Sequence, residues 1–210
     1  MSAESDPIFA RIARRYDLIN RILSFGQEQH WRRRAVEFLA DGVVVDLGSG
    51  TGAAAPIFGD RRVVAVDPVH EMLALSPIPE RVVGVGESLP FDDGSLDGVF
   101  SAYVFRNLTS VEATLAEIAR VLRPGGTAVV VDLGRPASRW LAMVHRAASA
   151  VVLPLVGLIA RAPGEYWYLH RSLDELGPPE GIYRSDALAI RRLWRMGPFG
   201  FVHAVVLERT

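Results

Sequence analysis

A β-branched run that breaks into a glycine-rich turn constrains this chain more than any other feature. Residues 43–47 read Val-Val-Val-Asp-Leu, and residues 48–52 read Gly-Ser-Gly-Thr-Gly, with a glycine at every second position. Glycine has no Cβ and adopts backbone conformations that strain other residues, so such a turn lets the backbone approach a ligand closely. The pattern predicts a buried strand that ends in a ligand-binding turn.

A second apolar strand follows the glycine turn. Residues 63–66 read Val-Val-Ala-Val and end at Asp67. A carboxylate at the end of the strand next to a glycine turn is well placed to accept hydrogen bonds from ribose hydroxyls. Together the two strands make a nucleoside-containing cofactor the leading hypothesis.

Two kinds of cofactor fit this pattern. Gly48, Gly50 and Ala53 satisfy the loose dinucleotide fingerprint G-x-G-x-x-G/A, which would suit a nicotinamide cofactor. Asp46, however, places a carboxylate where it could reach a cationic amino group, and the turn has no basic residue for a diphosphate. A ligand with an ammonium, a sulfonium and a ribose fits better, and the string resembles motif I of the class I S-adenosylmethionine (SAM) methyltransferases. A glycine-rich turn without a ligand is the remaining alternative.

Composition excludes several other classes of function. The 210 residues fit one domain, and the formal net charge of −1 gives no reason to expect a nucleic-acid partner. The chain has no cysteine, which removes disulfides, thiolate metal sites and cysteine nucleophiles, and no lysine, which removes Schiff-base chemistry. The histidines and carboxylates show no metal-ligand spacing, so we expect no metal.

The longest apolar run, residues 147–160, is shorter than the about 20 residues that a membrane span needs. The first residues are polar and acidic, unlike a signal peptide. We therefore expect a cytoplasmic protein, and peripheral contact with the inner face of the cell membrane stays open.

The pattern of elements predicts one α/β domain over residues 1–210. Residues 1–40 read as a helical cap, because apolar residues recur at helical spacing from Ile8 to Ile19 and again from Trp31 to Leu39. The Arg-Arg-Arg run at 32–34 is either a solvated helix face or a contact for anionic lipid or substrate. Residues 43–135 alternate strands with helices, which predicts a doubly wound, mostly parallel sheet with helices on both faces.

Finer expectations concern individual elements. Strands three, four and five are expected at 82–85, 98–104 and 127–133, and Thr109 with Glu112 forms a capping box for a helix that ends near Leu122. Residues 138–175 form an apolar helical insertion that could act as a lid. In residues 185–210, Ser185 is expected to cap a last helix through Met196, followed by a closing strand, so that a sixth strand would be vestigial.

Several strings together resemble one branch of the class I methyltransferases, the C-methyltransferases of ubiquinone and menaquinone biosynthesis. The Arg106-Asn107-Leu108 string just past strand four is the most telling. The other matching strings cover nearly the whole chain and lie at residues 9–20, 23–26 with Trp31, 89–91, 120–126, 152–157 and 168–173. The resemblance implies a Rossmann-like class I methyltransferase fold, SAM as cofactor and a quinol as methyl acceptor.

The chain departs from the family pattern at the adenine side. After strand three the family shows Asp or Asn, then Ala, then Glu, whereas this chain has Val85-Gly86-Glu87, and Ala102 stands where a serine lines the cofactor site. The resemblance implies the following cofactor-binding residues: Asp46, Gly48, Ser49, Gly50, Thr51 and Gly52 at the methionine end, Asp67 at the ribose, Val85, Gly86 and Glu87 around the adenine, and Pro68 and Ala102 elsewhere in the cofactor site.

The expected catalytic residues are Arg106, Asn107 and Tyr16. Arg106 is the best candidate to stabilise a developing phenolate, and Asn107 could orient the same group. The resemblance implies that Tyr16 contacts the substrate. Alternatively, Arg106 pairs with a carboxylate and Asn107 caps a turn, while Tyr16 packs in the core. His30 could face the site, and His145, His170 and His203 show no obvious partner.

The leading function is SAM-dependent C-methylation of a demethylmenaquinol-type polyprenyl quinol. The apolar insertion could form an entrance for the prenyl tail, an ordinary lid or the surface of a homodimer. A soluble phenolic or natural-product acceptor is an alternative, and so is a degenerate, non-catalytic SAM-binding partner subunit. A nicotinamide-dependent dehydrogenase remains a further reading of the glycine turn.

Overall fold

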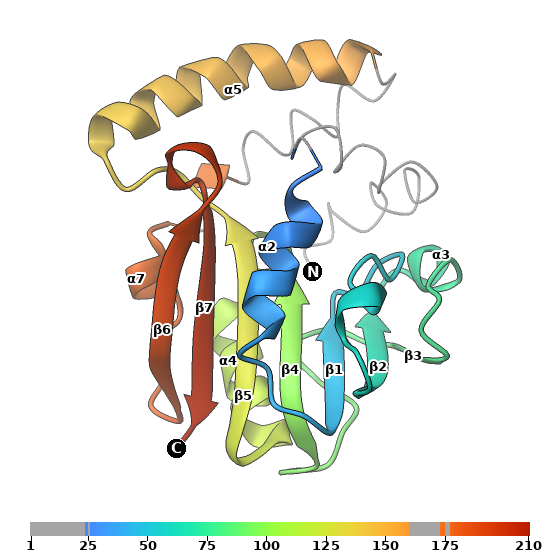
Figure 1. Ribbon diagram of the computed structural model, residues 1–210. Coiled ribbons are helices and arrows are strands. Elements are labelled where there is room, and N and C mark those ends of the chain that lie inside the picture. The colour runs from blue at the N-terminus through green and yellow to red at the C-terminus, as the bar shows by residue number, and fades with distance from the viewer. Residues whose placement is uncertain (1–23, 25, 160–172, 175–176) are drawn as a thin grey trace.

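A computed structural model describes residues 24, 26–159, 173–174 and 177–210 of the chain. Tyr16, His170 and the predicted helix at 8–19 lie outside these residues. The described part is built on a seven-stranded sheet with the strand order β3-β2-β1-β4-β5-β7-β6 (Figure 1). The strands are β1 (Val43–Leu47), β2 (Arg62–Asp67), β3 (Glu80–Val83), β4 (Leu96–Ala102), β5 (Leu122–Leu133), β6 (Leu188–Met196) and β7 (Val202–Arg209).

The first five strands are parallel, and β7 joins β5 in antiparallel fashion. The order reverses at β1, which pairs with β2 on one side and with β4 on the other. The crevice at the carboxyl ends of strands at such a switch point is the usual ligand site of a doubly wound sheet. The glycine turn follows β1 directly, so the sequence pattern and the topology place the site at the same edge.

Helices cover both faces of the sheet. They are α2 (Glu28–Val36), η1 (Ala55–Ile57), α3 (His70–Leu73), η2 (Phe105–Asn107), α4 (Val111–Val121), α5 (Arg139–Ile159), α7 (Pro179–Ile182) and η3 (Pro198–Gly200). Successive strand residues point to opposite faces. Val44 accordingly packs in one apolar cluster with Trp31 of α2, and Val45 packs in the other with Leu115 of α4. This arrangement confirms the predicted doubly wound α/β fold.

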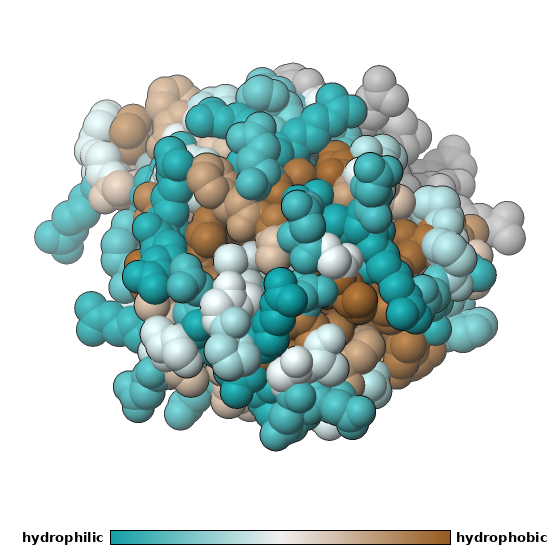
Figure 2. Space-filling model, turned by 60° about the horizontal axis from the view of Figure 1, so that its bottom comes forward, coloured by the Kyte–Doolittle hydropathy of each residue, from teal (hydrophilic) through white to brown (hydrophobic). Residues whose placement is uncertain are grey.

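Helix α5 lies across the carboxyl ends of the strands, at the top of Figure 1. Its 21 residues confirm the helix expected in the apolar insertion, and it continues through Pro154. In the ranges that the structure describes, no helix is both long enough and apolar enough to cross a membrane. The amino ends of the parallel strands lie at the other end of the molecule, which Figure 2 turns forward. There, hydrophilic side chains break up the brown apolar areas.

The expected last helix from Ser185 to Met196 is wrong, because this stretch forms strand β6. β6 pairs along its length with β7, from Leu188 opposite Arg209 to Met196 opposite Val202. The Ser185 hydroxyl accepts a hydrogen bond from Ala187 N at 3.3 Å within a turn and caps no helix. The sixth strand is therefore nine residues long rather than vestigial.

Smaller corrections concern element ends. Ser110 caps α4 by accepting a hydrogen bond from Ala113 N at 3.1 Å, one position after the expected Thr109. Strands β3 and β4 each begin and end two residues earlier than expected, and β5 begins at Leu122 instead of Thr127. β4 ends at Ala102 because Tyr103 adopts a φ of 68°, which is incompatible with a strand.

Candidate active site

The glycine turn is compact and tied to β2. The amides of Gly48 and Ser49 both donate to the carbonyl of Val66, at 2.7 and 3.1 Å. Gly48 has a φ of +68°, and a Cβ there would lie 2.2 Å from Cγ2 of Val104. A side chain at residue 48 would therefore be strained by the backbone and would also collide with the segment after β4.

Asp67 braces the turn from the end of β2. Its carboxylate accepts hydrogen bonds from Gly50 N and Val69 N, both at 2.9 Å, and the residue is buried. A carboxylate in this place can also accept hydrogen bonds from ribose hydroxyls, because each of its oxygens accepts more than one. The residue expected at the ribose thus also fixes the shape of the glycine turn.

Asp46 is a buried carboxylate at the end of β1. It is 2% exposed, and burial raises its pKa to about 6, against the opposing influence of Ser49 and Arg32. Its Oδ2 atom has no hydrogen-bond partner in the described part of the chain. A buried acceptor without a partner is costly, so this position fits a ligand that brings its own donors, such as an ammonium group.

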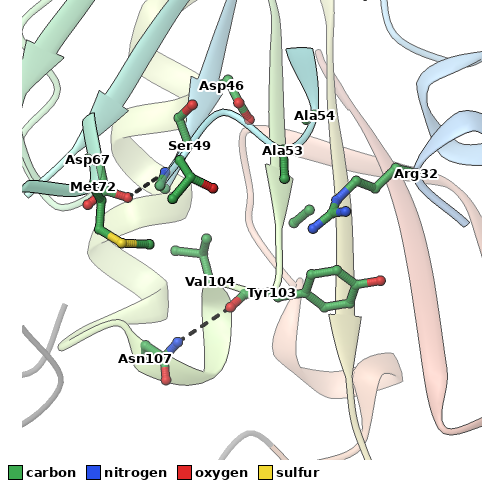
Figure 3. Close-up of a pocket in the computed structure, with 14 residues that line it drawn as sticks. Arg32, Asp46, Ser49, Ala53, Ala54, Asp67, Met72, Tyr103, Val104 and Asn107 are labelled. Carbon is green, nitrogen blue, oxygen red and sulfur yellow. Dashed lines mark hydrogen bonds between the residues drawn. The ribbon is translucent and has the colours of Figure 1, made fainter. Parts of the chain in front are cut away.

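These residues line one cavity, shown in Figure 3. The structure brings together eight of the predicted site residues there: Asp46, Gly48, Ser49, Gly50, Thr51, Asp67, Ala102 and Asn107. Residues that the sequence interpretation did not assign to the site also line it, namely Arg32, Ala53, Ala54, Met72, Tyr103 and Val104. We refer to this space as the cofactor cavity.

The other predicted cofactor residues do not line this cavity: Gly52, Pro68, Val85, Gly86 and Glu87. Glu87 accepts hydrogen bonds from Thr109 N at 2.8 Å and Ser110 N at 3.2 Å, so it holds the start of α4. Burial favours a higher pKa for Glu87, but hydrogen bonds from the backbone hold its pKa below the ordinary value. A Cβ on Gly86 would lie 2.9 Å from the Thr114 side chain. The expected contact of Val85, Gly86 and Glu87 with the adenine stays a prediction.

Arg106 and Asn107 both belong to η2, but their side chains have different partners. Arg106 Nη1 donates to Asp132 Oδ1 at 2.7 Å, with both side chains nearly fully buried. Asn107 donates to the Tyr103 carbonyl at 3.4 Å. The pairing of Arg106 with a carboxylate, left open by the sequence, is therefore present. Arg106 lines a second cavity, whereas Asn107 lines the cofactor cavity.

The second cavity has a volume of about 260 Å³ and lies beneath α5. Its lining is mostly apolar: Trp31, Tyr103, Leu133, Ala148, Val152, Leu153, Leu173 and Phe201, with Ser24, Glu28, Arg106, His145 and Ser149 as the polar residues. Tyr103 lines both cavities. We refer to this space as the acceptor cavity.

The histidines have partners that the sequence did not reveal. His145 lies in the acceptor cavity, with its Nδ1 atom 3.1 Å from Arg135 Nη1 and its ring stacked on Phe201. His203 is buried in the sheet with Nε2 2.8 Å from the Tyr183 hydroxyl, and burial lowers its pKa. His30 is exposed on α2.

Residues 2–181 match the profile of the ubiE/COQ5 methyltransferase family. The chain belongs to this family. Among its curated relatives are demethylmenaquinone methyltransferase of Thermus thermophilus, 37% identical over 87% of this chain and 90% of the relative, and the ubiquinone/menaquinone biosynthesis C-methyltransferase UbiE of Rubrivivax gelatinosus, 38% identical over 83% and 74%. Demethylmenaquinone methyltransferase of Tropheryma whipplei is 35% identical over 100% of this chain and 92% of its own.

Solved structures support the fold. A SAM-dependent methyltransferase from Thermotoga maritima superposes with a TM-score of 0.67 at 18% identity and covers 97% of this chain and 99% of its own. A SAM-dependent methyltransferase from Aquifex aeolicus gives a TM-score of 0.54 at 17% identity, with 91% and 98% covered. The chain is a SAM-dependent methyltransferase with the class I fold.

The cofactor cavity fits SAM in its chemistry. The unpartnered Asp46 oxygen suits the ammonium, and Asp67 at the end of β2 suits the ribose. Bound SAM supplies an electrophilic methyl group on a sulfonium.

Proposed function

We propose that this methyltransferase transfers a methyl group to a ring carbon of a demethylmenaquinol-type polyprenyl quinol, bound in the acceptor cavity. The observation that carries the proposal is the apolar acceptor cavity itself, which shares Tyr103 with the cofactor cavity. An apolar ring bound there would lie next to the methyl donor. The names of the curated relatives support the same acceptor class.

Positioning is the main demand of this reaction, because methyl transfer is an in-line displacement. With SAM bound, the methyl group would pass to the ring carbon, S-adenosylhomocysteine would leave, and the proton displaced from that carbon would go to water. Loss of a proton from an adjacent ring hydroxyl makes the carbon more nucleophilic. The acceptor must therefore be the reduced quinol, because the oxidised quinone has no such hydroxyl.

Arg106 is proposed to stabilise the developing phenolate from the wall of the acceptor cavity. Its guanidinium stays charged, and the buried Asp132 holds it in one orientation at 2.7 Å. Asn107, which lines the cofactor cavity, is proposed to orient the same developing phenolate. Tyr16 stays a prediction for substrate contact, as it lies outside the described residues.

The Tyr103 hydroxyl is a further candidate to contact the acceptor. It is buried and has no hydrogen-bond partner in the described structure, and its residue borders both cavities. A phenol in this place could donate a hydrogen bond to a ring oxygen of the quinol. The strained φ of 68° is consistent with a side chain held at a functional position.

The outward face of α5 is proposed to rest on the membrane. His145, Ser149, Val152 and Leu153 of α5 line the acceptor cavity, while other apolar side chains lie exposed on the helix: Trp140, Met143, Val144, Val151 and Leu155. The helix has no Asp or Glu and carries Arg139, which suits anionic lipid, whereas Arg146 is paired with Asp174 at 2.8 Å. A polyprenyl tail longer than the cavity could then remain in the bilayer.

Two acceptors with the same ring test the acceptor class. One carries a prenyl tail and the other lacks it, and both are supplied in reduced form with SAM. The proposal predicts a much lower KM for the tailed quinol in the presence of detergent or lipid. Equal KM values with no lipid dependence would favour the alternative, a soluble phenolic acceptor.

A further inference from the structure

Arg32 differs from the rest of the arginine run at 32–34. It is 5% exposed and lines the cofactor cavity, whereas Arg33 and Arg34 are exposed on the same helix, α2. Its guanidinium carbon lies 5.0 Å from the centre of the Tyr103 ring, within the range of a cation–π contact. The solvated-face reading of the run therefore fails at Arg32.

The guanidinium of Arg32 lacks partners for part of its hydrogen-bonding capacity. Its Nε and Nη1 atoms are buried and make no hydrogen bond in the described structure. A buried cation with unused donors is costly unless a ligand satisfies it, because the donors have been removed from water. The planar fork of arginine matches a carboxylate well.

The charges around the cavity indicate which ligand group Arg32 meets. Asp67, expected at the ribose, and Arg32 lie on opposite sides of the cavity in Figure 3, with Asp46 and Ser49 between them. The amino-acid end of SAM carries one ammonium and one carboxylate. A buried carboxylate and a buried guanidinium in one cavity complement such a zwitterion.

We propose that Arg32 binds the carboxylate of the methionine moiety of SAM, while Asp46 binds its ammonium. The inference rests on the cofactor and is independent of the methyl acceptor. It assigns a specificity role to a residue of α2, outside the glycine turn. Arg32 would then reject adenosyl ligands that lack the carboxylate.

The test compares SAM with decarboxylated SAM, which keeps the sulfonium and the ammonium. Binding is measured by calorimetry. We expect the unmodified protein to bind SAM about 10- to 100-fold more tightly, as for the loss of a hydrogen-bonded charged group. Arg32→Met should weaken SAM binding by a similar factor and leave the affinity for decarboxylated SAM unchanged. Arg33→Met, one residue along α2, is the control and should change neither affinity.

Either of two results would overturn the proposal. One is equal affinity of the unmodified protein for the two ligands. The other is an Arg32→Met variant that folds, as judged by its thermal melting, but whose affinities for SAM and decarboxylated SAM fall by the same factor. If Arg32→Met does not fold, the same two affinities are measured in Arg32→Lys. The comparison of SAM with decarboxylated SAM in the unmodified protein also tests the proposal, because it needs no substitution.

Discussion

At the scale of single residues, the proposed pairing of Asp46 with the SAM ammonium would make the cofactor affinity dependent on pH. Its pKa in the free protein is raised from 3.8 to about 6 by burial, so the carboxyl is increasingly protonated below pH 6. A protonated carboxyl cannot pair with the ammonium of SAM. The same raised pKa means that ionising Asp46 costs folding stability as the pH rises from about 4 to 6, and a bound ammonium would offset this cost.

We therefore predict that the affinity for S-adenosylhomocysteine falls below pH 6, by about tenfold at pH 5. Calorimetry across pH 5–8 measures the effect. Asp46→Asn should bind more weakly at pH 7 and lose this pH dependence. A flat profile in the unmodified protein would contradict the assigned role.

Tyr103→Phe tests the role of Tyr103 in the acceptor cavity separately from its role in the cofactor cavity. The substitution keeps the ring that contacts Arg32 and removes only the hydroxyl, which has no partner within the described residues. We expect kcat/KM for the acceptor to fall about tenfold, the value of one hydrogen bond, with the SAM affinity unchanged. An unaltered rate would show that the hydroxyl does not contact the acceptor.

Gly48→Ala and Gly59→Ala form a matched pair. Both glycines have positive φ, +68° and +62°, but a Cβ at Gly59 meets nothing within 4 Å, whereas one at Gly48 meets Val104. The backbone strain alone should cost about 1–2 kcal/mol in each variant. Gly48→Ala should cost more in a denaturant titration and should also lose SAM binding. Equal costs and retained binding would contradict a close-packed turn.

Much of the lining of the cofactor cavity was predictable because its pattern is local. Asp46, the glycines and Asp67 lie at strand ends, where sequence spacing and topology place them together. Arg32 and Tyr103 depend on non-local features: the docking of α2 over the turn, and a positive φ in a residue other than glycine. The burial of Arg32 had one signal, its place four positions before Val36, on the same face of α2, since Val36 is in the core.

At the scale of elements, the two faces of α5 are proposed to have different roles. We predict that replacing the exposed Trp140 and Leu155 by Glu reduces sedimentation with vesicles containing anionic lipid. Ile190→Glu, at an exposed apolar position on β6, serves as the control. Turnover of a tail-less acceptor should be unchanged in all variants.

Unchanged vesicle binding in the α5 variants would contradict the membrane role. A shift from dimer to monomer in analytical ultracentrifugation would instead assign this face to a homodimer, the other use of the insertion that the sequence left open.

Strand β6 shows where reasoning from local sequence fails. Residues 186–196 contain Ala, Leu and Arg, which favour helices, so local propensity alone predicts a helix there. The strand forms because β7 offers a complementary edge, with pairing from Leu188 to Met196. Strand propensity depends on such neighbours more than on the strand's own residues.

At the scale of the whole molecule, the sheet, α2 and α5 divide the site into two cavities. The switch point between β1 and β4 places the cofactor cavity, and α5 covers the acceptor cavity above β5. Tyr103, directly after β4, borders both. This arrangement suits a methyl donor whose amino-acid end is polar in the cofactor cavity, and an apolar methyl acceptor in the acceptor cavity.

The most direct test of the proposed function is methyl transfer from SAM carrying a ¹³C-labelled methyl group to a demethylmenaquinol kept reduced. The carbon chemical shift of the product distinguishes a methyl group on a ring carbon from one on oxygen. We predict label on a ring carbon, and no product from the oxidised quinone. Label on oxygen, or no transfer by protein that binds S-adenosylhomocysteine, would contradict C-methylation of a quinol.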